Sequence, residues 1–142
     1  MGILDDAVVD SSVIIARYVS EQHSIWAKNK MTEYGLFHIL DLSYYEVANV
    51  LRHMAPKKLT IEESRATFFE AKRLMNIFTL HNFSWVIDDA YALAVKLDIA
   101  VYDAAFVFLA DRLGVRLLTL DKELVKKVEG TKFSNLLEYP NK

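Results

Sequence analysis

The stretch AVVDSSVII, residues 7–15, decides the fold of this chain. Its β-branched and almost wholly apolar residues indicate a buried strand, and Asp10 marks the point where that strand stops. The same signals predict further strands at 36–40, 83–87, 115–120 and 133–139. Helices are expected at 23–34, from residue 43 to Pro56, at 60–77, at 88–97, from residue 103 to Gly114, and briefly after Asp121. This alternation predicts an α/β protein, a three-layer α/β/α fold around a central, mostly parallel sheet of four to five strands.

Two helix starts carry the same capping signal. Ser43 is followed three residues later by Glu46, and Thr60 by Glu63, the spacing of a capping box. The two helices that follow stand between the second and third predicted strands and interrupt simple alternation. Only four Gly and two Pro occur, so joins are short, and we expect residues 1–142 to form a single domain.

The composition excludes several classes of protein. The chain has no cysteine, which rules out disulfides, thiolate metal sites and cysteine nucleophiles. A domain that binds nucleic acid tightly through charge alone is strongly basic, whereas this chain has a net charge of -2. No apolar run approaches the ~20 residues that span a bilayer, and the N-terminus lacks the basic stretch of a secretory signal. We therefore expect a cytoplasmic protein without a membrane partner.

Four acidic residues stand where an apolar run gives way to a polar turn or a helix start: Asp10, Glu46, Asp103 and Asp121. The carboxyl ends of parallel strands share one edge of a sheet, so one edge can collect all four carboxylates. Converging carboxylates repel one another and invite a divalent cation, here Mg²⁺ or Mn²⁺ as one ion or two. Such a cation activates water for attack on a phosphodiester. The pattern predicts a metal-dependent nuclease.

The chain resembles the PIN-domain ribonucleases, and most closely the VapC-type toxins of toxin–antitoxin pairs. The resemblance runs from VVDSSVI, residues 8–14, to the Thr119-Leu120-Asp121 motif, and the family's four acids match the four residues named above. The run from Tyr102 to Ala105, followed by Leu109 and Ala110, is typical of the family's third motif. Supporting positions match at Ser12, Asn49 and Thr119.

The resemblance implies a metal-dependent endoribonuclease. Asp10, Asp103 and Asp121 would bind the metal, and Glu46 would bind metal or orient the attacking water. It also implies a homodimer and a small antitoxin partner. The basic residues nearest the acidic edge are expected to contact RNA phosphates: Arg17, Arg116 and Lys122. Arg52 and His53, with Lys57 and Lys58, form a second basic cluster, either a solvated helix end or a contact for the RNA backbone.

Simpler interpretations stay open. Asp10 could be a turn residue, Asp103 and Asp121 helix caps, and Glu46 only the capping partner of Ser43. The chain could be a housekeeping RNA-processing nuclease without an antitoxin, or a catalytically inactive PIN-fold binding module. Phosphoryl-transfer receivers and haloacid-type phosphatases fit poorly, because they need paired acids after the first strand or Asp-x-Asp on it.

Overall fold

The strands found within residues 5–141 all lie in one parallel sheet. The computed structural model describes residues 5–141. Its strands are β1 (Asp6–Val9), β2 (Leu36–Leu40), β3 (Thr79–His81), β4 (Arg116–Leu118) and β5 (Leu137–Glu138). They are ordered β3-β2-β1-β4-β5, and every neighbouring pair is parallel. In the central register Val8 pairs with His38 on one side and with Leu117 on the other. The predicted parallel sheet of four to five strands is confirmed.

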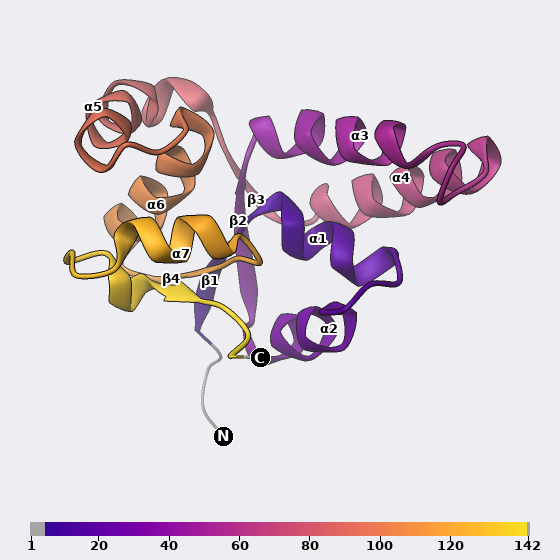
Figure 1. Cartoon of the computed structure of the whole chain (residues 1–142), viewed down its shortest axis with the longest axis horizontal. Helices are drawn as coiled ribbons and strands as arrows, with labels where there is room; N and C mark the ends of the chain where they lie inside the picture. The colour runs from indigo at the N-terminus through magenta and orange to yellow at the C-terminus, as the bar shows by residue number, and fades with distance from the viewer. Residues whose placement is uncertain (1–4, 142) are drawn as a thin grey trace.

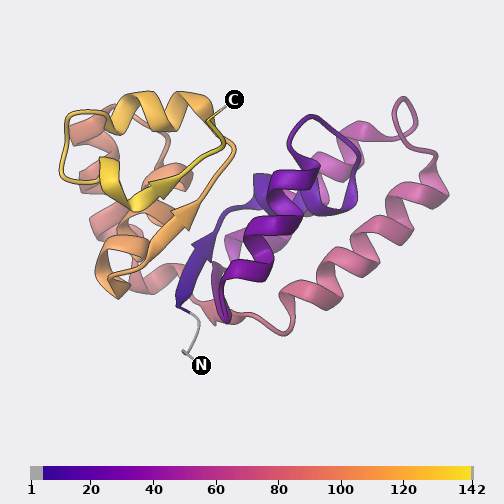
Figure 2. The ribbon, with the colours of Figure 1, turned by 90° about the horizontal axis from the view of Figure 1, so that it is seen from below.

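Helices cover both faces of this sheet. They are α1 (Ser11–Tyr18), α2 (Ser24–Glu33), α3 (Leu42–Met54), α4 (Ile61–Met75), α5 (Ile87–Leu97), α6 (Val101–Leu113) and α7 (Lys122–Val128), with 3₁₀ turns η1 (Phe83–Trp85) and η2 (Ser134–Leu136). Helices α1 to α4 lie on one side of the sheet and α5 to α7 on the other (Figures 1 and 2). The three-layer α/β/α arrangement is therefore confirmed, including the two consecutive helices between β2 and β3.

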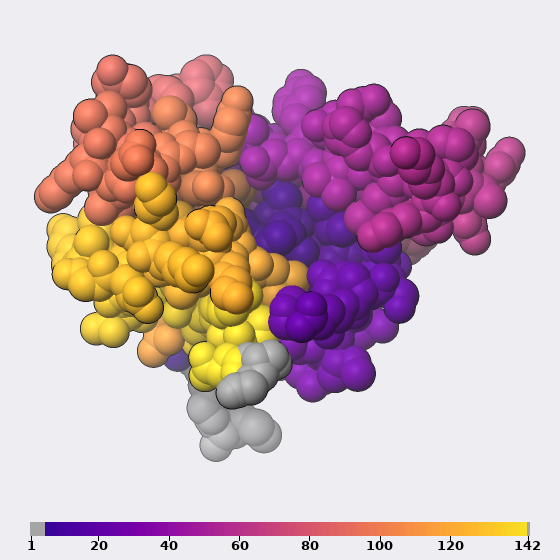
Figure 3. All heavy atoms as spheres, in the orientation of Figure 1, coloured from indigo at the N-terminus to yellow at the C-terminus, as the bar shows by residue number. Residues whose placement is uncertain are grey.

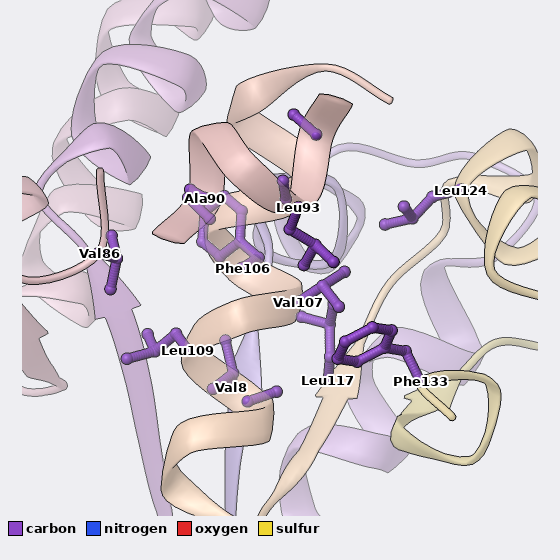
Figure 4. Close-up of a cluster of buried hydrophobic side chains, with 14 of the residues drawn as sticks. Val8, Val86, Ala90, Leu93, Phe106, Val107, Leu109, Leu117, Leu124 and Phe133 are labelled. Carbon is purple, nitrogen blue, oxygen red and sulfur yellow. The ribbon is translucent and has the colours of Figure 1, made fainter. Parts of the chain in front are cut away.

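Each face of the sheet has its own apolar core, because side chains alternate along a strand. In β1, Val8 packs against α5, α6 and α7, whereas Ala7 and Val9 pack against α1, α3 and α4. Figure 4 shows the first of these cores, which contains Val8 together with Phe106, Leu109 and Leu117. Both cores include residues of β1 and β4, so the loops at the carboxyl ends of these strands start from well-packed positions.

Two element predictions were wrong. The third strand is Thr79–His81 rather than 83–87, because the Asn82 side chain accepts a hydrogen bond from the Ser84 amide at 2.9 Å and starts the turn η1. The stretch after Asp10 was not predicted to be helical, yet α1 begins at Ser11. There the Asp10 carboxylate accepts from the Ser12 amide as an N-cap, and the apolar face of α1 is buried.

The capping box predicted at Ser43 is also wrong. Helix α3 begins at Leu42, whose amide donates to the Asp41 carboxylate at 2.9 Å, and a second Asp41 oxygen accepts from the Phe83 amide at 3.2 Å. Ser43 is fully buried, and its hydroxyl has no hydrogen-bond partner among the described residues. Because Asp41 caps the helix, the Glu46 carboxylate is available to other groups.

The capping box predicted at Thr60 is confirmed, and it yields a stability prediction. The Thr60 hydroxyl accepts from the Glu63 amide at 3.0 Å, and the Glu63 carboxylate accepts from the Thr60 amide at 2.9 Å. We expect Thr60→Ala to lower the free energy of unfolding by about 1 kcal/mol, measured by urea denaturation. Thr60→Ser keeps the hydroxyl and should stay close to the wild type; equal losses in both variants would contradict the capping role.

Within residues 5–141, the structure contains no helix that is both long enough and apolar enough to span a membrane.

Candidate active site

The four acids line one cavity at the carboxyl end of the sheet. The cavity has a volume of about 480 Å³ and is lined by Asp10, Ser11, Ser12, Ile15, Glu21, Glu46, Asn49, Val50, Asp103, Phe106, Leu120 and Asp121. Figure 3 shows a hollow between the purple atoms of α3 and the orange and yellow atoms of α6 and α7, with indigo atoms at its floor. Four helices start around it, α1, α3, α6 and α7, and helix N-termini favour negative charge.

Asp10 is the most buried of these acids, with only 8% of its surface exposed. It follows β1 directly, and its amide donates to the Leu118 carbonyl of β4 at 3.2 Å. Its carboxylate accepts from the Ser12 amide at 3.0 Å and from the Ser12 hydroxyl. Burial raises the pKa of Asp10 to about 6, although hydrogen bonds from Ser12 and Thr119 lower it. Hydrogen bonds therefore hold the Asp10 carboxylate in place, but burial still disfavours its charged form.

Two supporting hydroxyls join the acids to the backbone between β4 and α7. The Ser12 hydroxyl accepts from the Leu120 amide at 3.0 Å while it donates to Asp10. The buried Thr119 hydroxyl accepts from the Asp121 amide at 3.0 Å. Asp121 in turn caps α7, because its carboxylate accepts from the Leu124 amide at 3.1 Å. Ser12 and Thr119 thus set the distance between the first and the fourth acid.

Glu46 reaches the cavity from the second turn of α3. The Ser11 hydroxyl donates to Glu46 Oε1 at 2.6 Å, which joins residues 35 positions apart in the chain. Burial raises the pKa of Glu46, the bond from Ser11 lowers it, and the charge of Asp103 raises it further. Glu46 is therefore held by α1 rather than by its own helix terminus.

Asp103 lies in the first turn of α6, two residues beyond the helix start, so it is not the N-cap of that helix. Burial raises the pKa of Asp103 to about 6, and the charges of Asp121 and Asp10 add to the rise. Asp103 therefore interacts through charge with three other acids of the cavity: Asp10, Asp121 and Glu46. The simpler interpretation of Asp103 as a helix cap is wrong.

The chemistry of this donor set fits a hard divalent cation. The acid side chains offer carboxylate oxygens, and three of them carry raised pKa values that a cation would lower. No lysine or arginine is among the residues that line the cavity in the described chain. However, within residues 5–141 no three acidic or histidine side chains are already gathered into a coordination sphere. Binding an ion would therefore require the carboxylates to turn toward a common point.

The basic residues expected beside the acids are placed differently. Arg116 begins β4, pairs with Glu138 at 3.3 Å and lines a separate hollow with Asp5 and Tyr34, so its predicted place at the acidic edge is wrong. Residues at the start of a parallel strand lie at the opposite edge from those that follow it. Arg17 lies in the last turn of α1, with its guanidinium 5.6 Å from the Tyr18 ring. Lys122 remains next to Asp121 at the start of α7.

Four polar or aromatic residues near the acids were not predicted from the sequence, and one of them is Glu21, which lines the acidic cavity. Ser11 holds Glu46, and its position directly after Asp10 was the available signal. Tyr45 and Tyr102 lie in a second hollow that shares Glu46 and Asn49 with the acidic cavity. Each tyrosine directly precedes an acid, a pattern that is visible in the sequence.

This arrangement of acids around a parallel sheet agrees with the comparison to known families, because residues 7–130 match the PIN domain. The chain belongs to the PIN domain family. This PIN domain is 40% identical over 121 residues to the ribonuclease VapC3 of Pyrobaculum aerophilum, covering 84% of this chain and 92% of that relative. The resemblance to VapC-type proteins is therefore confirmed.

Two further comparisons extend this result. The PIN domain is 27% identical over 123 residues to the exonuclease VapC9 of the same organism, covering 87% of this chain and 86% of the relative. A solved toxin–antitoxin complex from Klebsiella pneumoniae contains a chain with the same fold, with a TM-score of 0.68 at 17% identity. That superposition covers 94% of this chain and 97% of the other.

The contacts of Ser12 lead to a prediction about how the PIN domain positions its acids. Ser12→Ala removes the hydroxyl bond to Asp10 and leaves the Leu120 amide without its acceptor. Removing a group that orients a metal ligand lowers activity or metal affinity by about 10- to 100-fold. Asp10 is a predicted ligand, so we expect a loss of that size in Mn²⁺ affinity. Isothermal titration with Mn²⁺ measures it, with Ser84→Ala on the exposed turn η1 as control. Unchanged Mn²⁺ affinity in Ser12→Ala would show that the Ser12 hydroxyl does not help to bind the metal.

Proposed function

We propose that this protein is a metal-dependent endoribonuclease and the toxin of a toxin–antitoxin pair, with residues 1–142 as one nuclease domain. The observation that carries the proposal is the convergence of four carboxylates from four elements on one cavity, in a PIN domain 40% identical to a ribonuclease. Asp10, Glu46, Asp103 and Asp121 would hold Mg²⁺ or Mn²⁺, as one ion or two. When bound, the ion lowers the pKa of the attacking water and offsets charge on the scissile phosphate.

The residues of the chain have separate roles in this proposal. Asp10 and Asp121 are held by hydrogen bonds after the ends of β1 and β4, so they would fix the position of the ion. Asp103, in the first turn of α6, interacts through charge with both of them and would be a further ligand of the ion. Glu46 accepts a hydrogen bond from Ser11 at one oxygen, and its other oxygen would bind the ion or orient the attacking water. Asn49 lines the same cavity one turn beyond Glu46 and would contact the substrate.

Attack by water on the phosphodiester, with departure of the 3′ oxygen, leaves a 5′-phosphate and a 3′-hydroxyl. Lys122, beside Asp121, is the basic residue nearest the acids that we retain as a phosphate contact.

The protein partners that we propose are an antitoxin and a second copy of this chain. The fold is shared with a chain of a toxin–antitoxin complex, which supports a small antitoxin as the inhibitor of this protein. We also propose a homodimer, supported by large apolar side chains exposed on α5 and on the turn before it. Trp85, Tyr91 and Val95 are each more than half exposed.

A housekeeping RNA-processing nuclease remains the second candidate, supported by a relative that is named as an exonuclease. An inactive binding module is the third, because the acids are not gathered around one point in the described residues.

One assay separates these functions. Linear and circular forms of the same single-stranded RNA are incubated with the protein and Mg²⁺, Mn²⁺ or EDTA, and the product ends are mapped. An endonuclease cuts both forms with metal and neither in EDTA. Cutting of the linear form alone would favour the exonuclease, and no cutting of any RNA would favour the binding module. Growth arrest on expression, relieved by a neighbouring open reading frame, would separate the toxin from a housekeeping enzyme.

A further inference from the structure

A second hollow adjoins the acidic cavity and is bordered by two tyrosines. It has a volume of about 640 Å³ and is lined by Tyr45, Glu46, Ala48, Asn49, Arg52 and Tyr102. We refer to it as the tyrosine groove. It shares Glu46 and Asn49 of α3 with the acidic cavity, so the two hollows lie next to each other. A volume between about 300 and 1,000 Å³ is typical of sites for small organic groups, so a nucleobase with its sugar fits.

The two tyrosines are exposed although they border the groove. Tyr45 has 78% of its surface exposed and Tyr102 has 59%. Each directly precedes an acid of the cavity, Glu46 on α3 and Asp103 on α6. Their positions relative to the acids are therefore fixed by helix geometry. Aromatic side chains offer apolar faces on which nucleobases stack, whatever the base.

Arg52 adds a cation to the far side of the groove. Its Nε donates to Asn49 Oδ1 at 3.2 Å, which places the guanidinium one turn along α3 from the shared wall. A guanidinium binds phosphate oxygens with two parallel hydrogen bonds. The groove thus offers stacking faces and a phosphate-binding group next to a cavity suited to a metal and a scissile phosphate. This order matches successive units of a nucleotide chain better than an apolar peptide segment.

We infer that Tyr45 and Tyr102 form a stacking site for an unpaired base adjacent to the cleaved phosphate, with Arg52 holding the next phosphate. The inference rests on the proposed nuclease function and adds to it residues that position the RNA beside the cleaved phosphate. Bases within a duplex already stack on their neighbours and cannot enter the groove. Tyr45 and Tyr102 are therefore positioning residues that select unpaired RNA.

The test measures binding separately from cleavage. Tyr45→Ala and Tyr102→Ala are made in the Asp103→Asn background, and the affinity for fluorescein-labelled single-stranded RNA is measured by anisotropy. We expect each substitution to weaken binding by roughly 5- to 150-fold, the range for loss of one base–aromatic stack. Tyr45→Phe and Tyr102→Phe keep the aromatic face and should bind within about twofold of their parent. Phe69→Ala is the control, since Phe69 is an aromatic residue 58% exposed on α4 and lies outside both hollows.

The outcomes distinguish the inference from the function. Unchanged affinity in both alanine variants, with metal-dependent cleavage by the wild type, would overturn the stacking site and leave the nuclease standing; the groove would then suit a protein partner. An equal loss for a duplex of the same sequence would also overturn it, because stacking requires unpaired bases. A wild type that neither binds nor cuts RNA would overturn both. Thermal unfolding of each variant checks that the fold is retained.

Discussion

Asp103→Asn is expected to lower metal-dependent RNA cleavage by on the order of 10³-fold while the fold is retained. Asparagine has nearly the same shape as aspartate, so the first turn of α6 should stay intact. The change removes one negative charge from between Asp10 and Asp121, whose charges act on Asp103. It therefore weakens the hold on a cation at the point where the acids of different elements meet.

The matched control lies on the same helix. Asp111→Asn makes the same chemical change at an exposed position of α6 that does not line the acidic cavity. Initial rates on labelled single-stranded RNA are compared at saturating Mg²⁺ for both variants and the wild type. If Asp103→Asn kept most of the activity, the assignment of the site would be wrong.

Asp10→Asn is expected to stabilise the metal-free protein at neutral pH by up to about 3 kcal/mol. The pKa of Asp10 is about 6 in the folded protein against an ordinary value of 3.8, and two pKa units correspond to about 3 kcal/mol. Between these pH values the folded state binds more protons than the unfolded state, so stability contributed by this group falls as pH rises from 3.8 to 6. Above pH 6 the charged, buried carboxylate lowers the free energy of unfolding by an amount that no longer changes with pH.

Asparagine removes this ionisation and can still cap α1, because its side-chain oxygen accepts the bond from the Ser12 amide. Urea denaturation in EDTA is compared at neutral pH and near pH 4, where Asp10 is protonated in the folded state. The stability gain over the wild type should be large at neutral pH and small at the acidic pH. A gain that did not depend on pH would show that Asp10 is not strained by its burial. Added Mn²⁺ should stabilise the wild type and not the variant.

Much of the fold could be predicted because strongly apolar strands carry their own signal. Most residues of β1, β2 and β4 are buried between the helices on the two faces of the sheet. Most of these residues are also apolar, so the strands stand out in the sequence. β3 was missed because it is an edge strand of three residues without a fully buried side chain, while the more apolar residues after it form a turn. Helix α1 was missed because its β-branched residues are as apolar as a strand, and only the Asp10 cap marks the change.

The acids of the site were predictable from their positions at the ends of apolar runs, but their contacts were not. Glu46 matched a capping pattern with Ser43 locally, whereas the structure pairs it with Ser11 from α1. No local rule anticipates a bond between residues so far apart in the chain. Arg116 was misplaced for a different reason, since a residue at the start of a parallel strand lies away from the carboxyl edge.

The central claim is that four carboxylates hold the ion on which RNA cleavage depends. Titrating Mn²⁺ into the wild type, while following bound Mn²⁺ by electron paramagnetic resonance and cleavage of one RNA in the same samples, tests it directly. The account predicts that binding and cleavage rise together, and that both are lost in the variant that combines Asp10→Asn with Asp103→Asn. Cleavage that persists in EDTA, or Mn²⁺ bound equally well by that variant, would contradict it.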